Sequence, residues 1–259
     1  MRVLTLALSL LFAGCQIASP PATVAPAPQP VSAVASDRFW PADGKFPVPG
    51  RTSSWSGFRE LNAQRRALFA ERRELDRNAI VFVGDSITQG WNTLEQDFAG
   101  LGVKVANRGI GGDTTPNLVY RLQDDVLALR PRGLVILIGT NDLAADTSPV
   151  QIAANLRVML ERIRASDPTM PIVWCLVMPR GADEDFPTRI RDLNARIVAL
   201  ARSDPHSTLC DTFTPLARPD GTSKPEDFNP DRLHLNAKGY AIWHEVLAPI
   251  LAEWSRSDR

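Results

Sequence analysis

The chain of 259 residues is poor in cysteine, histidine and tyrosine, with three Cys, three His and two Tyr. No spacing of Cys and His resembles a zinc site. The chain has no excess charge of either sign, because 29 basic and 29 acidic residues balance. This balance argues against a protein whose main task is binding the nucleic-acid backbone. Hydrophobic residues make up 44% of the sequence, enough for the core of one α/β domain or two very small ones.

The N-terminal sequence is typical of an export signal. Arg2 precedes a largely apolar run at residues 3–13, which is shorter than the roughly 20 residues of a membrane-spanning helix. Small residues then lead to Cys15, as in the lipobox of bacterial lipoproteins, although Phe12 stands where that motif usually has Leu. We expect lipidation of Cys15, with plain cleavage as the alternative. Either outcome gives an exported protein, and Gln16 in place of Asp favours the outer membrane over the inner membrane.

Residues 16–48 are rich in Pro and Ala, a composition that cannot fill a core. We expect this segment to be an extended tether between residues 1–15 and a folded domain at residues 49–259. The alternative is a disordered tail without a role. Two further cysteines, Cys175 and Cys210, have apolar neighbours, so we expect buried free thiols, although export also permits a disulfide.

Apolar runs and amphipathic segments alternate along the rest of the chain. This alternation predicts an α/β fold, a three-layer α/β/α flavodoxin-like sandwich with a five-stranded parallel sheet. The expected strands lie at residues 80–83, 103–106, 134–138, 172–177 and 207–211. The expected helices lie at residues 53–77, 115–129, 149–165, 187–202 and 236–254.

Three polar, glycine-containing segments follow strands directly, at residues 84–86, 109–113 and 139–142. In parallel sheets, ligands bind beyond the carboxyl ends of the strands. The three segments are therefore expected at one rim of the sheet.

A serine hydroxyl needs a neighbouring base, most often His, and a third group that orients the base. His206 lies in a polar turn, and His244 lies within the last helix. His234 lies in a loop, three residues after Asp231. Elimination favours His234 as the base, with a solvated loop histidine as the alternative.

Four segments resemble the conserved blocks of the GDSL, or SGNH, hydrolase superfamily. They are Gly-Asp-Ser-Ile-Thr at residues 84–88, Gly112 within residues 109–114, Asn141 within residues 139–142, and residues 231–234. Their order and spacing match across roughly residues 80–250. The residues in these blocks are most similar to those of the branch that contains the catalytic subunits of platelet-activating-factor acetylhydrolase.

The resemblance implies a role for each matching residue. Ser86 would attack the acyl carbonyl, His234 would accept its proton, and Asp231 would orient His234. The oxyanion would be bound by the backbone N–H groups of Ser86 and Gly112 and by the side-chain amide of Asn141. No metal or organic cofactor is needed for this chemistry.

Other residues near these blocks have weaker assignments. Asp85 and Asp142 are expected to brace turns, and Asp113 with Thr114 is expected to cap the following helix. Four residues are candidates for the substrate pocket, with core packing or a solvated position as the alternative for each: Trp91, Arg180, Phe186 and Leu233.

The expected function is hydrolysis of short acyl esters, with acetyl esters of a carbohydrate or other envelope material favoured. One alternative is a lysophospholipase or thioesterase for longer chains, and another is a non-catalytic carbohydrate- or lipid-binding module. The expected partner is a small-molecule or glycan ester, with no nucleic acid, and with membrane contact only through the lipid anchor. The sequence does not determine the oligomeric state.

Overall fold

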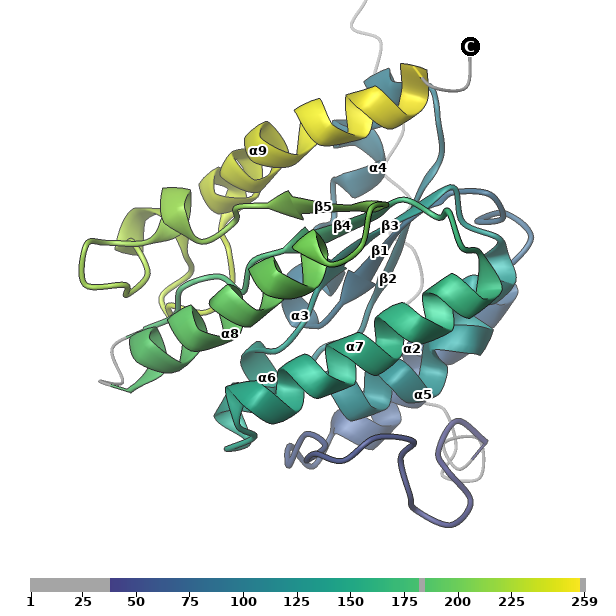
Figure 1. Ribbon diagram of the computed structural model, residues 1–259, viewed down its shortest axis with the longest axis horizontal. Coiled ribbons are helices and arrows are strands. Elements are labelled where there is room, and N and C mark those ends of the chain that lie inside the picture. The colour runs from purple at the N-terminus through teal and green to yellow at the C-terminus, as the bar shows by residue number, and fades with distance from the viewer. Residues whose placement is uncertain (1–37, 182–184, 257–259) are drawn as a thin grey trace, which may run out of the picture.

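Figure 1 shows a sheet covered by helices on both faces in a computed structural model that describes residues 38–181 and 185–256. The signal segment, Cys15 and most of the expected tether lie outside the described residues. Within the described residues, no helix is both long enough and apolar enough to span a membrane.

The sheet has five parallel strands in the order β2-β1-β3-β4-β5, which confirms the predicted fold class and the flavodoxin-like strand order. The strands are β1 (Ile80–Gly84), β2 (Val105–Gly109), β3 (Gly133–Leu137), β4 (Ile172–Cys175) and β5 (Ser207–Cys210). Strand β2 lies later than the expected 103–106 because its pairing with β1 continues through the polar residues Asn107 and Arg108. Apolar patterning does not reveal such residues as part of a strand.

Side chains of alternate strand residues enter two separate cores. Val81 and Val83 pack against α5 (Thr115–Asp125), α7 (Pro149–Ser166) and α8 (Phe186–Arg202). Ile80 and Phe82 pack on the other face against α3 (Ser86–Gln89), α4 (Leu94–Asp97) and α9 (Ala237–Arg256). The strands β1, β3 and β4 are buried along their whole length, which explains why their sequences are continuously apolar.

Helix α2 (Phe58–Glu71) is shorter than the expected helix at residues 53–77 and begins after Gly57, a weak helix former. Helix α5 ends at Asp125, and a short 3₁₀ turn, Leu127–Leu129, follows it. That turn stops where Arg130 adopts a left-handed conformation with φ of 50°. A short helix not expected from the sequence, α6 (Thr140–Ala144), contains Asn141.

The last part of the expected tether contacts the domain, so the packed chain begins earlier than residue 49. The Trp40 ring lies 6.0 Å from the Phe58 ring, and the Phe46 ring lies 5.7 Å from the Tyr120 ring, both measured between centroids. Val48 is also buried. These aromatic and aliphatic residues distinguish the end of the segment from its Pro/Ala-rich beginning.

Cys175 and Cys210 are register partners on β4 and β5. Both are buried free thiols, as preferred from the sequence.

Candidate active site

Strands β1, β2 and β3 end together. Gly84 pairs in register with both Gly109 and Leu137, so the three polar segments begin at one edge of the sheet. The expectation that they meet at one rim is confirmed.

Ser86 is the first residue of α3, directly beyond β1. The turn before it is tight, because a Cβ atom at position 84 would overlap the Leu137 carbonyl and the Thr88 hydroxyl. The Asp85 carboxylate accepts a hydrogen bond from the Ile87 backbone N–H at 2.9 Å and thereby caps α3. This is the bracing role expected for Asp85.

His234 and Asp231 lie in the loop before α9. The Asp231 Oδ2 atom lies 2.6 Å from Nδ1 of His234, and Oδ1 accepts backbone N–H bonds from Leu233 and His234, each at 3.0 Å. Arg232, which follows Asp231 in this loop, has a left-handed conformation with φ of 58°. Partial burial opposes ionisation of Asp231, but the bonds from His234 and Leu233 outweigh it and lower the pKa of this carboxyl to about 2.

The Ser86 hydroxyl oxygen lies 2.8 Å from Nε2 of His234, although the two residues are 148 positions apart. Folding therefore brings together three residues in a continuous chain of contacts from Ser86 through His234 to Asp231. This is the arrangement in which a histidine can remove a proton from a serine hydroxyl.

Gly112 and Asn141 line the same hollow as Ser86. Gly112 has φ of +80°, and a Cβ there would approach Cδ2 of Phe58 to 3.0 Å and Oγ of Ser53 to 3.2 Å. The Asn141 side-chain amide donates one hydrogen bond to the Asp113 carbonyl at 3.0 Å. An amide of this type has two N–H donors, so this bond fixes its orientation and leaves the second N–H for another acceptor.

Two hollows flank the Ser86–His234 pair. One, of about 760 Å³, is bounded by Gly112 and Asn141 and by the side chains of Trp55, Leu61 and Leu233. The other, of about 680 Å³, lies toward α9. Its walls include Asn92, Asp97, Tyr240 and His244. Ser86 and His234 line both hollows, so a substrate bound across them would have its scissile bond at this pair.

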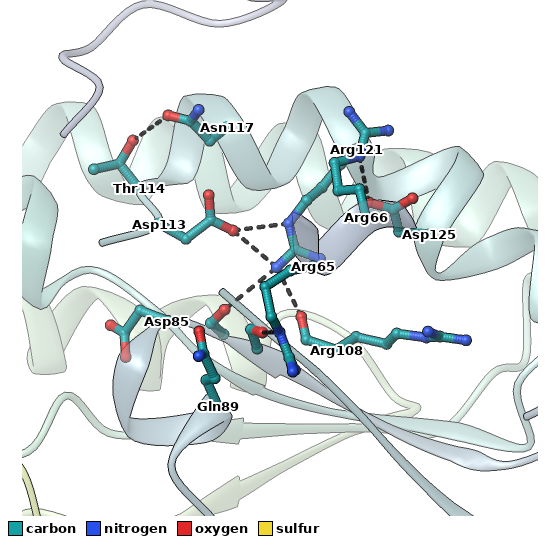
Figure 2. Close-up of polar contacts among 12 residues, drawn as sticks. Arg65, Arg66, Asp85, Gln89, Arg108, Asp113, Thr114, Asn117, Arg121 and Asp125 are labelled. Carbon is teal, nitrogen blue, oxygen red and sulfur yellow. Dashed lines mark hydrogen bonds and ion pairs between the residues drawn. The ribbon is translucent and has the colours of Figure 1, made fainter. Parts of the chain in front are cut away.

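Three carboxyl groups are buried beneath the rim. Burial raises the pKa of Asp85 and of Asp142 to about 7 and that of Asp113 to about 6. Figure 2 shows Asp113 bonded to the guanidinium of Arg121, with Nε and Oδ2 2.8 Å apart.

The prediction that Asp113 and Thr114 cap α5 through their side chains is wrong. Asp113 bonds to Arg121, and the Thr114 hydroxyl donates to Asn117. The backbone N–H of Thr115, the first residue of α5, is bound by Asp142, whose two oxygens each lie 3.0 Å from this nitrogen. Asp142 thus braces a turn, as expected, but the partner comes from a different segment.

Of the four pocket candidates, only Leu233 lines a hollow at Ser86, as far as the described residues show. Trp91 is 2% exposed and packs in the core, with its ring 4.6 Å from the Trp243 ring. The Arg180 guanidinium lies over the Phe186 ring at 4.3 Å. Trp91 is therefore corrected from a pocket position to a core position, while Arg180 and Phe186 are half-buried and their place in a pocket stays a prediction.

Sequence reasoning missed several residues of the first hollow, among them Gln89 and Trp55. Gln89, one turn after Ser86, accepts a hydrogen bond from the Gly111 backbone N–H at 2.6 Å. Trp55 is 56% exposed at the edge of the hollow. Trp55 lies in the segment that was expected to be a helix, where only its large aromatic side chain could have indicated a role at the site. Nothing in the sequence around Gln89 indicates such a role.

The model of the GDSL-like Lipase/Acylhydrolase family matches residues 82–242, more than half of the chain. The chain belongs to the GDSL-like lipase/acylhydrolase family. It is a carboxylic ester hydrolase, and the matched residues include all of the rim segments described above.

Two relatives of this acylhydrolase are platelet-activating factor acetylhydrolase IB subunits. The human alpha1 subunit is 28% identical over 186 residues, which cover 67% of this chain and 77% of the relative. The bovine alpha2 subunit is 29% identical, covering 67% and 78%.

Solved structures are similar to the chain as well. A GDSL-like lipase from Bacteroides thetaiotaomicron is 25% identical with a TM-score of 0.62, covering 72% of this chain and 97% of that one. An acetyl xylan esterase is 22% identical with a TM-score of 0.55, covering 66% and 98%, which is a likeness of fold.

Proposed function

We propose that this acylhydrolase is an exported serine esterase that cleaves short-chain acyl esters, acetyl esters foremost, through Ser86, His234 and Asp231. The observation that carries the proposal is the unbroken chain of contacts, 2.8 Å from Ser86 to His234 and 2.6 Å from His234 to Asp231. Separations of this size are within the range for proton transfer along hydrogen bonds.

The reaction begins when the Ser86 oxygen attacks the acyl carbon and its proton moves to Nε2 of His234. The Asp231 carboxylate keeps Nδ1 protonated and so directs the free lone pair of Nε2 toward Ser86. Collapse of the tetrahedral intermediate breaks the ester bond, and the leaving alcohol takes the proton from His234. Water then attacks the acyl-enzyme with His234 again as base, which releases the acid and restores Ser86.

The negative charge on the carbonyl oxygen is stabilised by three N–H donors in this proposal. They are the backbone groups of Ser86 and Gly112 and the side-chain amide of Asn141. The bond from Asn141 to the Asp113 carbonyl supports this role, because it orients the amide before substrate arrives. Donors already in place need no reorganisation during the reaction.

A short acyl group is favoured by the relatives, whose name is acetylhydrolase. The crowding around Gly112 also supports it, because Phe58 and Ser53 leave little room beyond the backbone there. A longer acyl chain is the second candidate, supported by the apolar side chains of Leu61 and Leu233 in the hollow of about 760 Å³.

The chain organisation is also part of the proposal. Residues 1–15 act as a signal with Cys15 as the lipid attachment site, and the Pro/Ala-rich segment links this anchor to the hydrolase domain. The protein would then reside at the outer membrane or in the periplasm. Fractionation of cells that express wild type or Cys15→Ser tests this, because only wild type should remain with the membranes. Equal release of both proteins would exclude the anchor.

The deciding experiment compares hydrolysis of p-nitrophenyl acetate, butyrate and octanoate by wild type, Ser86→Ala and His234→Ala. We expect wild type to prefer acetate and both variants to lose activity by about 10³-fold or more. A preference for octanoate would favour the longer-chain candidate. Activity that survives Ser86→Ala would disprove the proposed nucleophile.

A further inference from the structure

A buried cation, Arg121 of α5, lies beneath the rim. Its side chain is 1% exposed and that of its partner Asp113 is 0% exposed. A buried ion pair is a weak source of stability, because apolar residues of similar volume often do as well or better. The pair therefore calls for an explanation other than stability.

The guanidinium contacts two of the three polar segments of the candidate site, at residues 84–86 and 109–113, and the strand β2. Figure 2 shows its bonds to Asp113 and to the Arg108 carbonyl. Nη2 donates to the Gly84 carbonyl at 3.3 Å, two residues before Ser86, and to the Arg108 carbonyl at 2.8 Å, one residue before the end of β2. Nε donates to the Asp113 carboxylate at 2.8 Å, one residue after Gly112.

Asp113 extends this connection to the third strand. Its side chain is held by Arg121, while its backbone carbonyl accepts the Asn141 amide at 3.0 Å. A shift of Asp113 would therefore move Gly112, its covalent neighbour, and release Asn141. Both changes affect expected oxyanion donors.

We propose that Arg121 is a positioning residue for the oxyanion site. Its rigid fork of donors holds the segments of Ser86 and Gly112 in their relative places directly, and that of Asn141 through Asp113. This inference rests on the proposed function. Lysine cannot replace the fork, because it offers a single nitrogen on a flexible stem. Displacements of about 1 Å in a reacting group can cost on the order of 10² in rate.

The chain offers a matched control in Arg66 of α2. Arg66 is 4% exposed and pairs with buried Asp125 at 2.7 Å, and it donates to the Phe39 carbonyl at 2.9 Å. It thus resembles Arg121 in burial and pairing, but its partners Asp125, Asp124 and the Phe39 carbonyl lie outside the three rim segments. Arg66→Lys should reproduce the loss of stability without the loss of turnover.

The test measures kcat, KM and the thermal midpoint for Arg121→Lys and Arg66→Lys in the full chain, with p-nitrophenyl acetate as substrate. We expect kcat to fall by about 10- to 100-fold in Arg121→Lys, with KM changed less than about threefold, and to stay near wild type in Arg66→Lys. Equal kcat values in the two variants would overturn the inference.

A double-mutant cycle separates positioning from general damage. If Arg121 acts partly through Asn141, Arg121→Lys should cost less in an Asn141→Ala background than in wild type. Equal costs in both backgrounds would show that it does not act through Asn141. If Arg121→Lys fails to fold, Asp113→Asn replaces it, because that variant keeps the shape and removes only the charge.

Labelling of Ser86 by a fluorophosphonate gives a readout independent of the ester. Slower labelling of Arg121→Lys than of Arg66→Lys supports the inference even when no ester tested is the natural one. If wild type is neither hydrolytic nor labelled, the proposed function fails and the inference fails with it. Active wild type with equal labelling of the two variants rejects the positioning role alone.

Discussion

Oδ2 of Asp231 lies 2.6 Å from Nδ1 of His234, within a single loop that also supplies two backbone N–H bonds to the same carboxylate. The orientation of the proposed base thus depends on local geometry, and only its distance from Ser86 depends on the rest of the fold. Each partner can therefore be tested separately.

Asp231→Asn should lower kcat by about 10²- to 10⁴-fold with little change in KM, since the amide favours the wrong histidine tautomer. In wild type the pKa of Asp231 is lowered to about 2, so this carboxyl stays ionised at any pH above about 4. The pH–rate profile of wild type should then show no inflection from Asp231 above that pH. A kcat of Asp231→Asn close to that of wild type would remove Asp231 from the proposed mechanism.

Asn141→Ala should lower kcat by about 10²- to 10³-fold, the usual cost of one lost oxyanion donor. Steady-state kinetics on p-nitrophenyl acetate measures this, with thermal unfolding as the check on folding. A rise in KM alone would assign Asn141 to substrate binding in the ground state instead.

Gly112→Ala should inactivate the enzyme for two reasons, the φ of +80° and the approach of the new Cβ to Phe58. Gly102→Ala is the matched control, because Gly102 has φ of +69° with nothing within 4 Å of a Cβ. Both variants should lose on the order of 1 kcal/mol of stability. Only Gly112→Ala should lose turnover, as kinetics and thermal melts of both proteins will show. Similar losses of turnover in both would contradict a special role for the space at Gly112.

The buried carboxyl groups predict how stability depends on pH. The folded protein holds the Asp85 proton more tightly than the unfolded chain, because burial raises its pKa to about 7. The folded state therefore binds more protons between about pH 4 and 7, and the free energy of unfolding falls as pH rises through this window. Asp113 and Asp142 act in the same direction.

Asp85→Asn keeps an oxygen that can accept the Ile87 N–H bond but cannot ionise. Thermal midpoints measured from pH 5 to 8 should decline less in this variant than in wild type. Each kcal/mol by which the substitution reduces the loss of unfolding free energy between pH 5 and 8 corresponds to about 2–4 °C in the thermal midpoint for a domain of this size. Parallel curves for the two proteins would show that Asp85 is not responsible.

The two thiols in the sheet should be unreactive in the folded protein. Burial is the main reason that the pKa of Cys175 is raised well above its usual value, and Cys210 is buried beside it. A Cys15→Ser chain should release no colour from a disulfide reagent until denaturant is added, and should then titrate as two thiols. Rapid reaction of the native chain would show that this edge of the sheet opens.

Much of the fold could be predicted because its signals are local. Strands β1 and β3 are continuous apolar runs bounded by polar residues, and the rim residues Ser86, Gly112 and Asn141 lie in short segments directly after strands. Because these segments directly follow strands, their place at the rim of the sheet could be predicted without knowledge of side-chain packing.

Two residues were missed or misplaced because their contacts join distant segments. Arg121 lies in an amphipathic helix where a charged residue reads as solvated, and only folding buries it against Gly84 and Asp113. Trp91 lies near Ser86 in sequence, but its ring is taken into the core by Trp243 from the last helix. No local pattern distinguishes these cases from exposed or pocket residues.

The strand order also sets when activity can appear during synthesis. Ser86, Gly112 and Asn141 are synthesised directly after the strands β1, β2 and β3, which are neighbours in the sheet. His234 comes later, after the edge strand β5. A nascent chain would therefore hold the proposed nucleophile and oxyanion segments while still lacking the proposed base. Hydrolysis would begin only when the final loop docks, so esterase turnover would report the end of folding and not its early stages.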